Sequence, residues 1–432
     1  MIWCRALLLI FLALPVTAQE VRSLAPIDQA KYLIAIGLLK DAEDVLGRFL
    51  EIHPDDIEAR FLEATIAAEE TRWSDAIKWY RGILSQHPDL LRVRLDYARA
   101  LFEDGQDEEA DYNFRLALPD VPEAAAANIY GYLNQIETRK RFTYGLSIGG
   151  SLDSDINAAP AVSQLTLFGL PFTLSPGNRA TSGVGVIVNG SAEYRLPLAE
   201  DPWQLRLRFG GGLYRAEYFG GHSRFDDMIA RVYSGPQLLF DKGDVSLLGV
   251  ANMRWYGNDP YNWGYGPRAE IRYSLTNRIL LQAGLEYTPD WYHTQTFENG
   301  QLLTGLATTS YVISPASFVS LITGIAHEHA AAPGFSNLSY RIGLGYQREL
   351  PLGITLYFQP EVLLAYYAAP SAFFGTTRRD RLAQVQLTLS KRDFRFWGFI
   401  PSITYNFSED DSNQPLFSFR RHQLLIGLSK AF

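Results

Sequence analysis

The sequence predicts a two-part fold: an N-terminal helical repeat domain followed by a transmembrane antiparallel β-barrel of the outer-membrane type. Three observations carry this prediction. Residues from Arg141 onward alternate apolar and polar side chains, the segment before them repeats every 34 residues, and the chain begins with an apolar export segment. A barrel presents every second residue to lipid, so its strands show a period of two instead of the long apolar run of a membrane helix.

The N-terminal residues predict a signal peptide over Met1–Ala18. Arg5 supplies the positive flank, Ala6–Leu14 the apolar segment, and Ala18 the small residue before the cleavage point. An uncleaved membrane anchor is the alternative, but the apolar run is too short to span a bilayer. Cys4 is the only cysteine, so the exported chain is expected to contain neither a disulfide nor a reactive thiol.

Residues 19–140 are predicted to form a periplasmic helical domain of three repeats and a capping helix over Pro122–Glu137. Small residues recur where paired helices must cross closely, large residues fill the gaps between pairs, and proline follows the second helix. This period and pattern resemble the tetratricopeptide repeat. The recurring positions are Ala30, Ala64 and Ala98; Ala42, Ala76 and Ala110; Leu46, Tyr80 and Phe114; and Pro54, Pro88 and Pro122.

Stacked helix pairs leave a concave face that is lined mainly by the first helix of each pair. We expect this face to form a groove for an extended polypeptide, with aromatic anchors and orienting arginines. Phe61 and Phe102 could instead belong to the core between repeats. The groove residues are Lys31, Phe61, Thr65, Arg92, Leu95, Arg99 and Phe102.

Charge is distributed unevenly between the two parts. Residues 19–140 hold 24 acidic and 14 basic side chains, whereas residues 141–432 are nearly neutral. The acidic part could steer basic clients or periplasmic chaperones toward the protein, or it could simply be a set of solvated helix faces. Neither part carries a basic stripe, so a nucleic-acid partner is not expected.

Residues 141–432 are predicted to form about fourteen strands, the first near 141–151 and the last at 417–432. Their apolar residues should contact outer-membrane lipid, and their polar residues should face the lumen, because an arginine in the lipid midplane costs about 2 to 4 kcal/mol. A soluble β-sandwich or propeller is the alternative architecture. The lumen candidates are Arg206, Arg208, Arg341, Gln384 and Gln386.

The predicted connections alternate in length. Short turns are expected on the periplasmic side at 241–244, 276–277, 315–316, 351–352 and 392–393, with a strand over 394–407 after the last of these, and longer loops on the outside. The first connection, 152–182, is long, which leaves the helical domain in the periplasm. Leu428 and Phe432 in the last strand are expected to be the assembly signal that the barrel-assembly machinery recognises.

A three-repeat helical domain followed by this barrel resembles the surface lipoprotein assembly modulator family, the outer-membrane component of type XI secretion. The polar loop with Asp153, Asp155, Asn157 and Pro160 is similar to the family's Asp/Asn-rich segment, and Lys391–Pro401 is a second similar stretch. The resemblance implies that specific client proteins, either lipid-anchored or soluble, are carried across the outer membrane. The repeats would receive the client and the barrel would form or assist its passage.

Enzyme and cofactor chemistry is not expected. The sequence contains no GxxxxGK[ST], GxSxG or HExxH motif, and the triplet His327–Glu328–His329 lacks further ligands for a metal. An exopolysaccharide export porin, which also joins such repeats to a barrel, is the alternative function. The short repeat array and the inward arginines favour a protein cargo over a carbohydrate. A general diffusion porin would leave the helical part unexplained.

Overall fold

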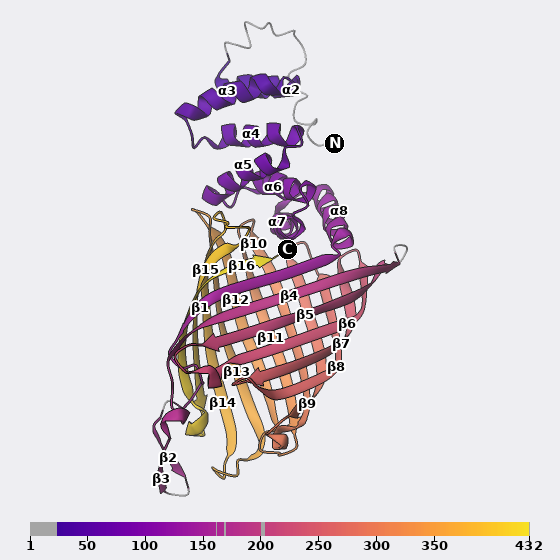
Figure 1. Cartoon of the computed structure of the whole chain (residues 1–432). Helices are drawn as coiled ribbons and strands as arrows, with labels where there is room; N and C mark the ends of the chain where they lie inside the picture. The colour runs from indigo at the N-terminus through magenta and orange to yellow at the C-terminus, as the bar shows by residue number, and fades with distance from the viewer. Residues whose placement is uncertain (1–23, 161, 168–169, 200–203, 432) are drawn as a thin grey trace. The chain divides into compact units, whose positions relative to one another are not determined.

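The computed structural model describes residues 24–160, 162–167, 170–199 and 204–431. The predicted signal peptide and Phe432 therefore lie outside the described residues. The helices come first in the chain and the strands follow (Figure 1). Among the described residues, no helix is both long and apolar enough to cross a bilayer. The helices are α2 Pro26–Ala35, α3 Leu39–Ile52, α4 Ile57–Glu69, α5 Trp73–Gln86, α6 Leu91–Glu103, α7 Asp107–Ala117 and α8 Glu123–Arg139, with a 3₁₀ turn, η1, at Leu118–Asp120.

The 34-residue period of the sequence recurs as structure. Gly37, Thr71 and Gly105 each follow the first helix of a pair, lie 34 positions apart, and have φ of +81°, +57° and +78°. A left-handed residue ends a helix and reverses the chain, and glycine does so without a steric cost. The small recurring residues are buried as predicted: Ala30, Ala64, Ala98, Ala42, Ala76 and Ala110 are all 0% exposed.

A recurring arginine closes the boundary between repeats, which the sequence reading did not identify. Arg60 Nε donates to the Pro54 carbonyl at 2.6 Å, and 34 residues later Arg94 Nη2 donates to the Pro88 carbonyl at 2.8 Å. Arg94 is 1% exposed and also donates to Asn113 Oδ1 at 2.6 Å. These bonds satisfy the carbonyl group of the proline that follows the C-cap of each second helix.

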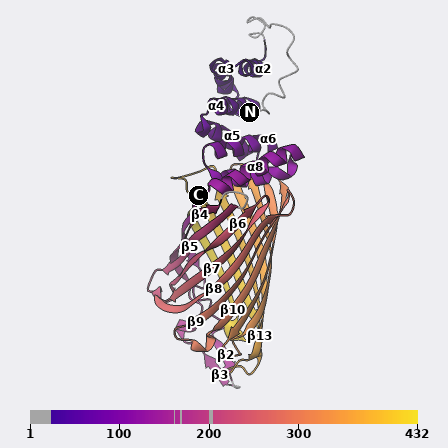
Figure 2. The ribbon, with the colours of Figure 1, turned by 90° about the vertical axis from the view of Figure 1, so that its right-hand side faces the viewer.

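Fourteen strands close into one antiparallel barrel, which confirms the predicted fold (Figures 1 and 2). Each strand pairs with its neighbour in sequence, and β1 closes the barrel by pairing with β16 from Gly145–Ala431 to Asp153–Gln423. The barrel strands are β1 Phe142–Asp153, β4 Gly183–Ala199, β5 Gln204–Tyr218, β6 Asp227–Phe240, β7 Gly243–Tyr256, β8 Asp259–Ser274, β9 Ile279–Tyr292, β10 Gly300–Ser314, β11 Ser317–Ala330, β12 Asn337–Leu350, β13 Ile354–Pro370, β14 Thr377–Lys391, β15 Ile400–Ser412 and β16 Phe419–Ala431.

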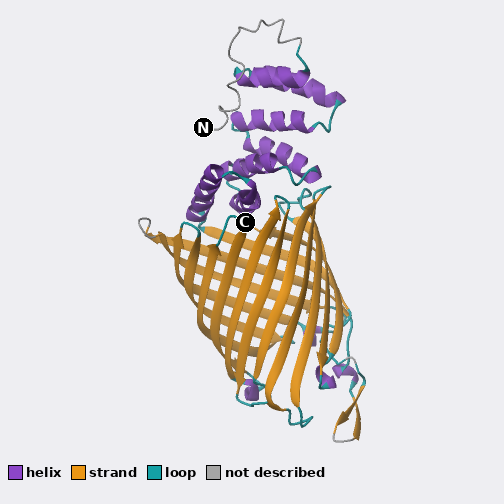
Figure 3. Ribbon diagram, turned by 180° about the vertical axis from the view of Figure 1, so that it is seen from behind, coloured by secondary structure: helices purple, strands orange, loops and turns teal. Residues whose placement is uncertain are grey.

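Two rims are distinguished by their connections. The turn rim carries the connections at 241–242, 275–278, 315–316, 351–353 and 392–399. The loop rim carries the β1–β4 connection and those at 219–226, 257–258, 293–299, 331–336, 371–376 and 413–418. The long first connection contains an unpredicted hairpin of β2 Gln164–Leu167 and β3 Leu170–Thr173, which projects beyond the loop rim (Figure 3).

Two connections differ from the predicted alternation. On the loop rim, β7 and β8 are joined by only Gly257 and Asn258, both with positive φ, which is the geometry of a two-residue hairpin turn. On the turn rim, the tight turn predicted at 392–393 is wrong. Trp397 and Gly398 have φ of +51° and +82°, so residues 394–399 cannot continue an extended strand, and β15 begins only at Ile400.

By contacts, the chain separates into one unit that ends at Phe114 and another that begins at Arg115. The second unit includes η1, α8 and the barrel. The buried face of α8 carries Ile129, Leu133 and Ile136.

Candidate functional site

Two predicted groove residues meet on the first-helix face of the repeats. The guanidinium of Arg92 on α6 lies 5.7 Å from the ring centroid of Phe61 on α4, within the range of a cation–π contact. The Phe61 ring also packs against Tyr80 of α5 at 5.9 Å. Phe61 remains half-buried, so an aromatic edge with a cation beside it is presented at this surface.

The other groove candidates differ in how far their side chains are exposed to solvent. Lys31 is exposed and pairs with Glu58 across α2 and α4 at 2.6 Å. Arg99 is exposed and Leu95 half-buried, while the Thr65 hydroxyl donates within its own helix to the Phe61 carbonyl at 2.9 Å. Phe102 is only 7% exposed, which places it in the core between helices.

Glu63 is a titratable group inside the repeat domain that the sequence reading missed. It is 6% exposed, and no hydrogen bond to its carboxylate is found among the described residues. Burial, followed by the charge of Glu43, raises its pKa to about 7, although Arg72 opposes the shift. This carboxyl is therefore partly protonated near neutral pH.

The barrel lumen is identified by bonds that span several strands. Arg208 on β5 donates to Glu193 Oε2 of β4 at 2.7 Å, to Ser246 Oγ of β7 at 2.9 Å and to Glu270 Oε2 of β8 at 2.8 Å. Side chains of strands that are three apart can meet only across the concave interior of a barrel. The predicted inward position of Arg208 therefore agrees with its geometry.

These residues belong to a continuous charged surface, named here the charged wall. Arg268 pairs with Glu270 at 2.6 Å and with Glu286 at 3.2 Å, and Arg231 also binds Glu286. The wall lines a lumen cavity of about 710 Å³. It consists of Glu193, Arg208, Arg231, Arg268, Glu270 and Glu286, on strands β4 to β9.

At the turn rim, the end of helix α8 binds two arginines of the barrel that lie next to the charged wall. Glu137, near the end of α8, accepts from Arg272 at 2.7 Å and lies 3.5 Å from Arg206, which also donates to the Glu137 carbonyl. Burial alone would raise the pKa of Glu137, but the charge and hydrogen bond of Arg272 outweigh it and lower this pKa to about 2. Arg206 is 4% exposed, so this lumen candidate is a helix anchor.

Further contacts hold the same segment against the rim. The Tyr130 hydroxyl donates to Asn277 Oδ1 at 2.9 Å, and Lys242 lies 6.0 Å from the centroid of the Tyr130 ring. In η1, Asp120 pairs with Arg278 at 2.6 Å. The sequence contained no signal for these pairs, because they join residues that are more than 100 positions apart.

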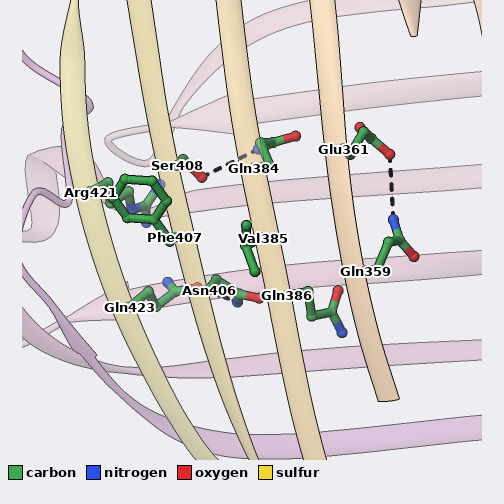
Figure 4. Close-up of a pocket in the computed structure, with 10 residues that line it drawn as sticks. All are labelled: Gln359, Glu361, Gln384, Val385, Gln386, Asn406, Phe407, Ser408, Arg421 and Gln423. Carbon is green, nitrogen blue, oxygen red and sulfur yellow. Dashed lines mark hydrogen bonds between the residues drawn. The ribbon is translucent and has the colours of Figure 1, made fainter. Parts of the chain in front are cut away.

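The opposite side of the lumen has a different chemistry. Gln384 donates to Ser408 Oγ at 3.3 Å, Gln386 to Thr388 Oγ1 at 3.2 Å, and Asn406 to Gln423 Oε1 at 3.1 Å. Apart from Thr388, these side chains line a cavity of about 260 Å³ on β14, β15 and β16 (Figure 4). We name this surface the amide wall: Gln359, Gln384, Gln386, Asn406, Ser408 and Gln423, on strands β13 to β16.

Arg341, the remaining lumen candidate, lies beside the amide wall. It pairs with Glu361 of β13 at 3.3 Å, and its side chain is 41% exposed. The Arg341 side chain is more exposed than the arginines of the charged wall. The five lumen candidates are thus divided between two surfaces and a helix anchor.

The polar segment that begins at the end of β1 forms hydrogen bonds to β16, the last strand. Asp153 is 5% exposed and accepts from Arg421 Nε at 3.0 Å and from Gln423 Nε2 at 2.9 Å. Asp155 is 1% exposed and accepts from the Ala159 amide at 3.1 Å.

Asn157 continues this loop on the side of the returning chain. Its side chain donates to the Arg179 carbonyl and accepts from the Thr181 amide, both at 3.0 Å, while Pro160 is half-buried. These residues hold the loop together and close the barrel.

The triplet on β11 does not gather ligands. His327 and His329 are exposed on one face, while Glu328 lies on the other and accepts from Asn337 Nδ2 at 2.7 Å. Among the described residues, no group of three or more His, Cys, Asp or Glu side chains is arranged to hold a metal ion.

The closed barrel with an apolar exterior and a polar lumen, preceded by helical repeats, defines an outer-membrane β-barrel protein of the Gram-negative envelope whose repeat domain is periplasmic. Comparison with known families agrees. The sequence of residues 143–432 matches the surface lipoprotein assembly modifier family, and residues 48–114 match that family's N-terminal TPR repeats. The chain belongs to the surface lipoprotein assembly modifier family.

Relatives resemble this chain over nearly its whole length. It is 22% identical over 419 residues to the surface lipoprotein assembly modifier of Pasteurella multocida, covering 91% of this chain and 80% of the relative. It is 24% identical to surface lipoprotein assembly modifier 1 of Haemophilus influenzae, with 86% and 76% covered. The hemophilin secretion modulator of Acinetobacter baumannii is 20% identical, with 86% and 78% covered.

Solved structures resemble the chain only remotely. An outer membrane channel from Pseudomonas putida F1 aligns with a TM-score of 0.37 and 13% identity, over 68% of this chain and 96% of that one.

Proposed function

We propose that this protein helps specific surface lipoproteins cross the outer membrane. The observation that carries the proposal is the family match, which covers both the repeats and the barrel. Relatives are named for surface lipoprotein assembly, and one is named for the secretion of hemophilin, so soluble secreted proteins belong to the same proposal.

The two parts of the chain have separate roles in this proposal. The first-helix face with Phe61 and Arg92 receives an extended client segment, because an aromatic edge with an adjacent cation can bind apolar and acidic side chains. The barrel forms or assists the passage. Periplasmic chaperones deliver the client, and the barrel-assembly machinery inserts the protein into outer-membrane lipid.

The first test compares surface-exposed and released proteins of cells in which the gene is deleted and then restored. Protease shaving and analysis of the culture supernatant should show the reversible loss of one or a few surface or secreted proteins. An unchanged protein profile with lost extracellular polysaccharide would overturn the proposal in favour of an exopolysaccharide export porin.

A second test removes the receiving domain and leaves the barrel intact. Deletion of residues 24–114 retains α8, whose Glu137 neutralises the buried Arg206 of the barrel. We expect normal heat-modifiable mobility of the barrel on gels, together with loss of client export. Continued export by this deletion would contradict the role of the repeats.

Point substitutions test the same face with a smaller change. Replacing Phe61 and Arg92 together with alanine should reduce client export at least fivefold without a change in barrel assembly. Arg48→Ala is the matched control, since Arg48 is an exposed arginine on the second helix of the first pair. Equal export by the double variant and the control would exclude this face.

A further inference from the structure

We infer that the unfolded client crosses the barrel along the amide wall of strands β13 to β16. The inference rests on the proposed function and specifies the surface that the polypeptide touches. Four features of the barrel support it: the saturation of the charged wall, the position of α8, the unused hydrogen-bonding capacity of the amides, and the low relief of the adjoining seam.

The charged wall has little capacity left for a passing chain. Arg208 alone makes bonds to Glu193, Ser246 and Glu270, and Arg268 pairs with both Glu270 and Glu286. A client peptide could bind to Arg208 only by displacing one of these partners. Hydrogen bonds to charged groups are also the stronger class, so a chain that did bind would be held instead of released.

Helix α8 occupies the entrance on the same side. The contacts of α8 and η1 with the rim involve Arg206 of β5, Arg272 of β8, and Asn277 and Arg278 of the turn before β9. Figure 1 places the end of α8 at one side of the turn rim, opposite the side where β15 is labelled. A chain entering from the periplasm therefore meets helix on the charged side.

The amide wall offers neutral groups that match those of a polypeptide backbone. A glutamine side chain carries two N–H donors and a carbonyl with two acceptor positions. Gln384 and Gln386 each donate one long bond, and neither side-chain carbonyl has a partner among the described residues. The two charged side chains that also line this cavity are already paired, Glu361 with Arg341 and Arg421 with Asp153.

The wall continues into a seam of low relief. Gly149 of β1 pairs directly with Gly427 of β16, and a Cβ atom on Gly427 would lie 2.5 Å from the Ile148 carbonyl oxygen. No side chain fits at Gly427, so the lumen surface at this pairing is bare backbone. Nearby, Ser147 pairs with Ser429, while Leu425, the next inward residue toward the amides, packs against the cluster that contains Ile156 and Tyr218. At the Gly149–Gly427 pair itself a sliding chain meets no side-chain obstacle.

The test compares two glutamines on opposite walls. Gln386 lies on the amide wall and Gln282 of β9 lines the cavity of the charged wall, so both are the same residue type in the same lumen. Each is replaced in the full-length protein by the photo-crosslinking residue p-benzoylphenylalanine. The probe is an epitope-tagged form of the surface protein whose export is lost in the deletion strain.

We expect the crosslinked client to be at least tenfold more abundant with the label at Gln386 than at Gln282. Equal or reversed yields, in cells that still export the probe, would overturn the inference while leaving the proposed function intact. If deletion removes no surface or secreted protein, the proposed function fails and this inference fails with it.

A second pair of variants tests the same inference without the photo-crosslinking label, in case the labelled proteins fold poorly. Gln386→Lys should lower the export rate at least fivefold, because a fixed charge on the path retains the client, whereas Gln282→Lys should lower it less than twofold. Heat-modifiable mobility confirms assembly of both. A larger loss for Gln282→Lys would overturn the inference.

Discussion

The two sides of the lumen have similar strands but different side-chain bonding. Both sides are built from antiparallel strands of similar length with inward polar residues. Yet Arg208 and Arg268 of the charged wall each bind several partners, whereas Gln384 and Gln386 of the amide wall each donate a single neutral bond of 3.2 to 3.3 Å. Neutral hydrogen bonds contribute about 0.5 to 1.5 kcal/mol each, whereas removing one member of a buried ion pair costs about 3 to 5 kcal/mol. One side is therefore fixed by its own charges, and the other can exchange partners.

The largest expected effect comes from breaking the charged wall at its most connected residue. Arg208→Ala removes charge-assisted bonds to two acids, Glu193 and Glu270, each worth about 1.5 to 3 kcal/mol, and should lower the free energy of unfolding by about 3 to 5 kcal/mol even though Arg195 still pairs with Glu193. Gln386→Ala, the matched change on the amide wall, should lower it by at most about 1 kcal/mol. The temperature at which the folded gel band is lost measures both. Equal losses would show that the two walls do not differ in energy.

A somewhat smaller effect is expected at the end of the charged wall. Glu137→Gln removes the carboxylate that Arg272 and Arg206 share, and should weaken the docking of α8 by about 3 kcal/mol. Amide hydrogen exchange of residues 130–139 should rise accordingly. Glu123→Gln, at the exposed start of α8, is the control and should leave exchange unchanged. Unaltered exchange in Glu137→Gln would mean that the ion pairs do not hold the helix.

The pH dependence of the same contact has a definite sign. The pKa of Glu137 is lowered from 4.5 to about 2, so its contribution is fully present above pH 4.5 and is lost as the pH falls toward 2. Exchange protection of α8 should therefore be equal at pH 7 and pH 5, after correction for the intrinsic exchange rate, and should fall below about pH 4. Loss of protection between pH 7 and pH 5 would contradict this assignment.

The smallest effect is expected for Arg341, which lies beside the amide wall. Its pair with Glu361 is 3.3 Å long and its side chain is 41% exposed, so Arg341→Gln should change the free energy of unfolding by about 0 to 1 kcal/mol. The same thermal gel assay measures this change. If Arg341→Gln lowered the free energy of unfolding as much as Arg208→Ala does, Arg341 would belong to the charged wall.

Periodic features of the fold could be predicted from the sequence, and pairings across the barrel could not. The 34-residue spacing of Ala30, Ala64 and Ala98 and the alternation along the strands are local patterns, so they specified helix pairs and inward faces. The partners of Arg206 and Arg208 depend on which residues the closed barrel brings together. Sequence reasoning placed both in the lumen but could not assign one to a helix anchor and the other to a salt-bridge network.

Turns were the other source of error, for local conformational reasons. Asn258 is a residue that tolerates a left-handed backbone after glycine, so the pair Gly257–Asn258 could have been recognised as a two-residue hairpin. Trp397 offered no such signal, because a bulky residue rarely adopts positive φ. The strand predicted over 394–407 therefore began six residues too early.

The contact between Asp153 and Arg421 makes barrel closure dependent on the pairing of β1 with β16. Asp153 is almost fully buried on the first strand, and Arg421 and Gln423, which bind its carboxylate, lie on β16. Until β16 arrives, β1 carries a carboxylate with no counter-charge at the position where the barrel must close. A barrel without β16 would therefore have an open edge and an unneutralised acid at the same place. The ion pair thus stabilises only the closed barrel and not an open sheet.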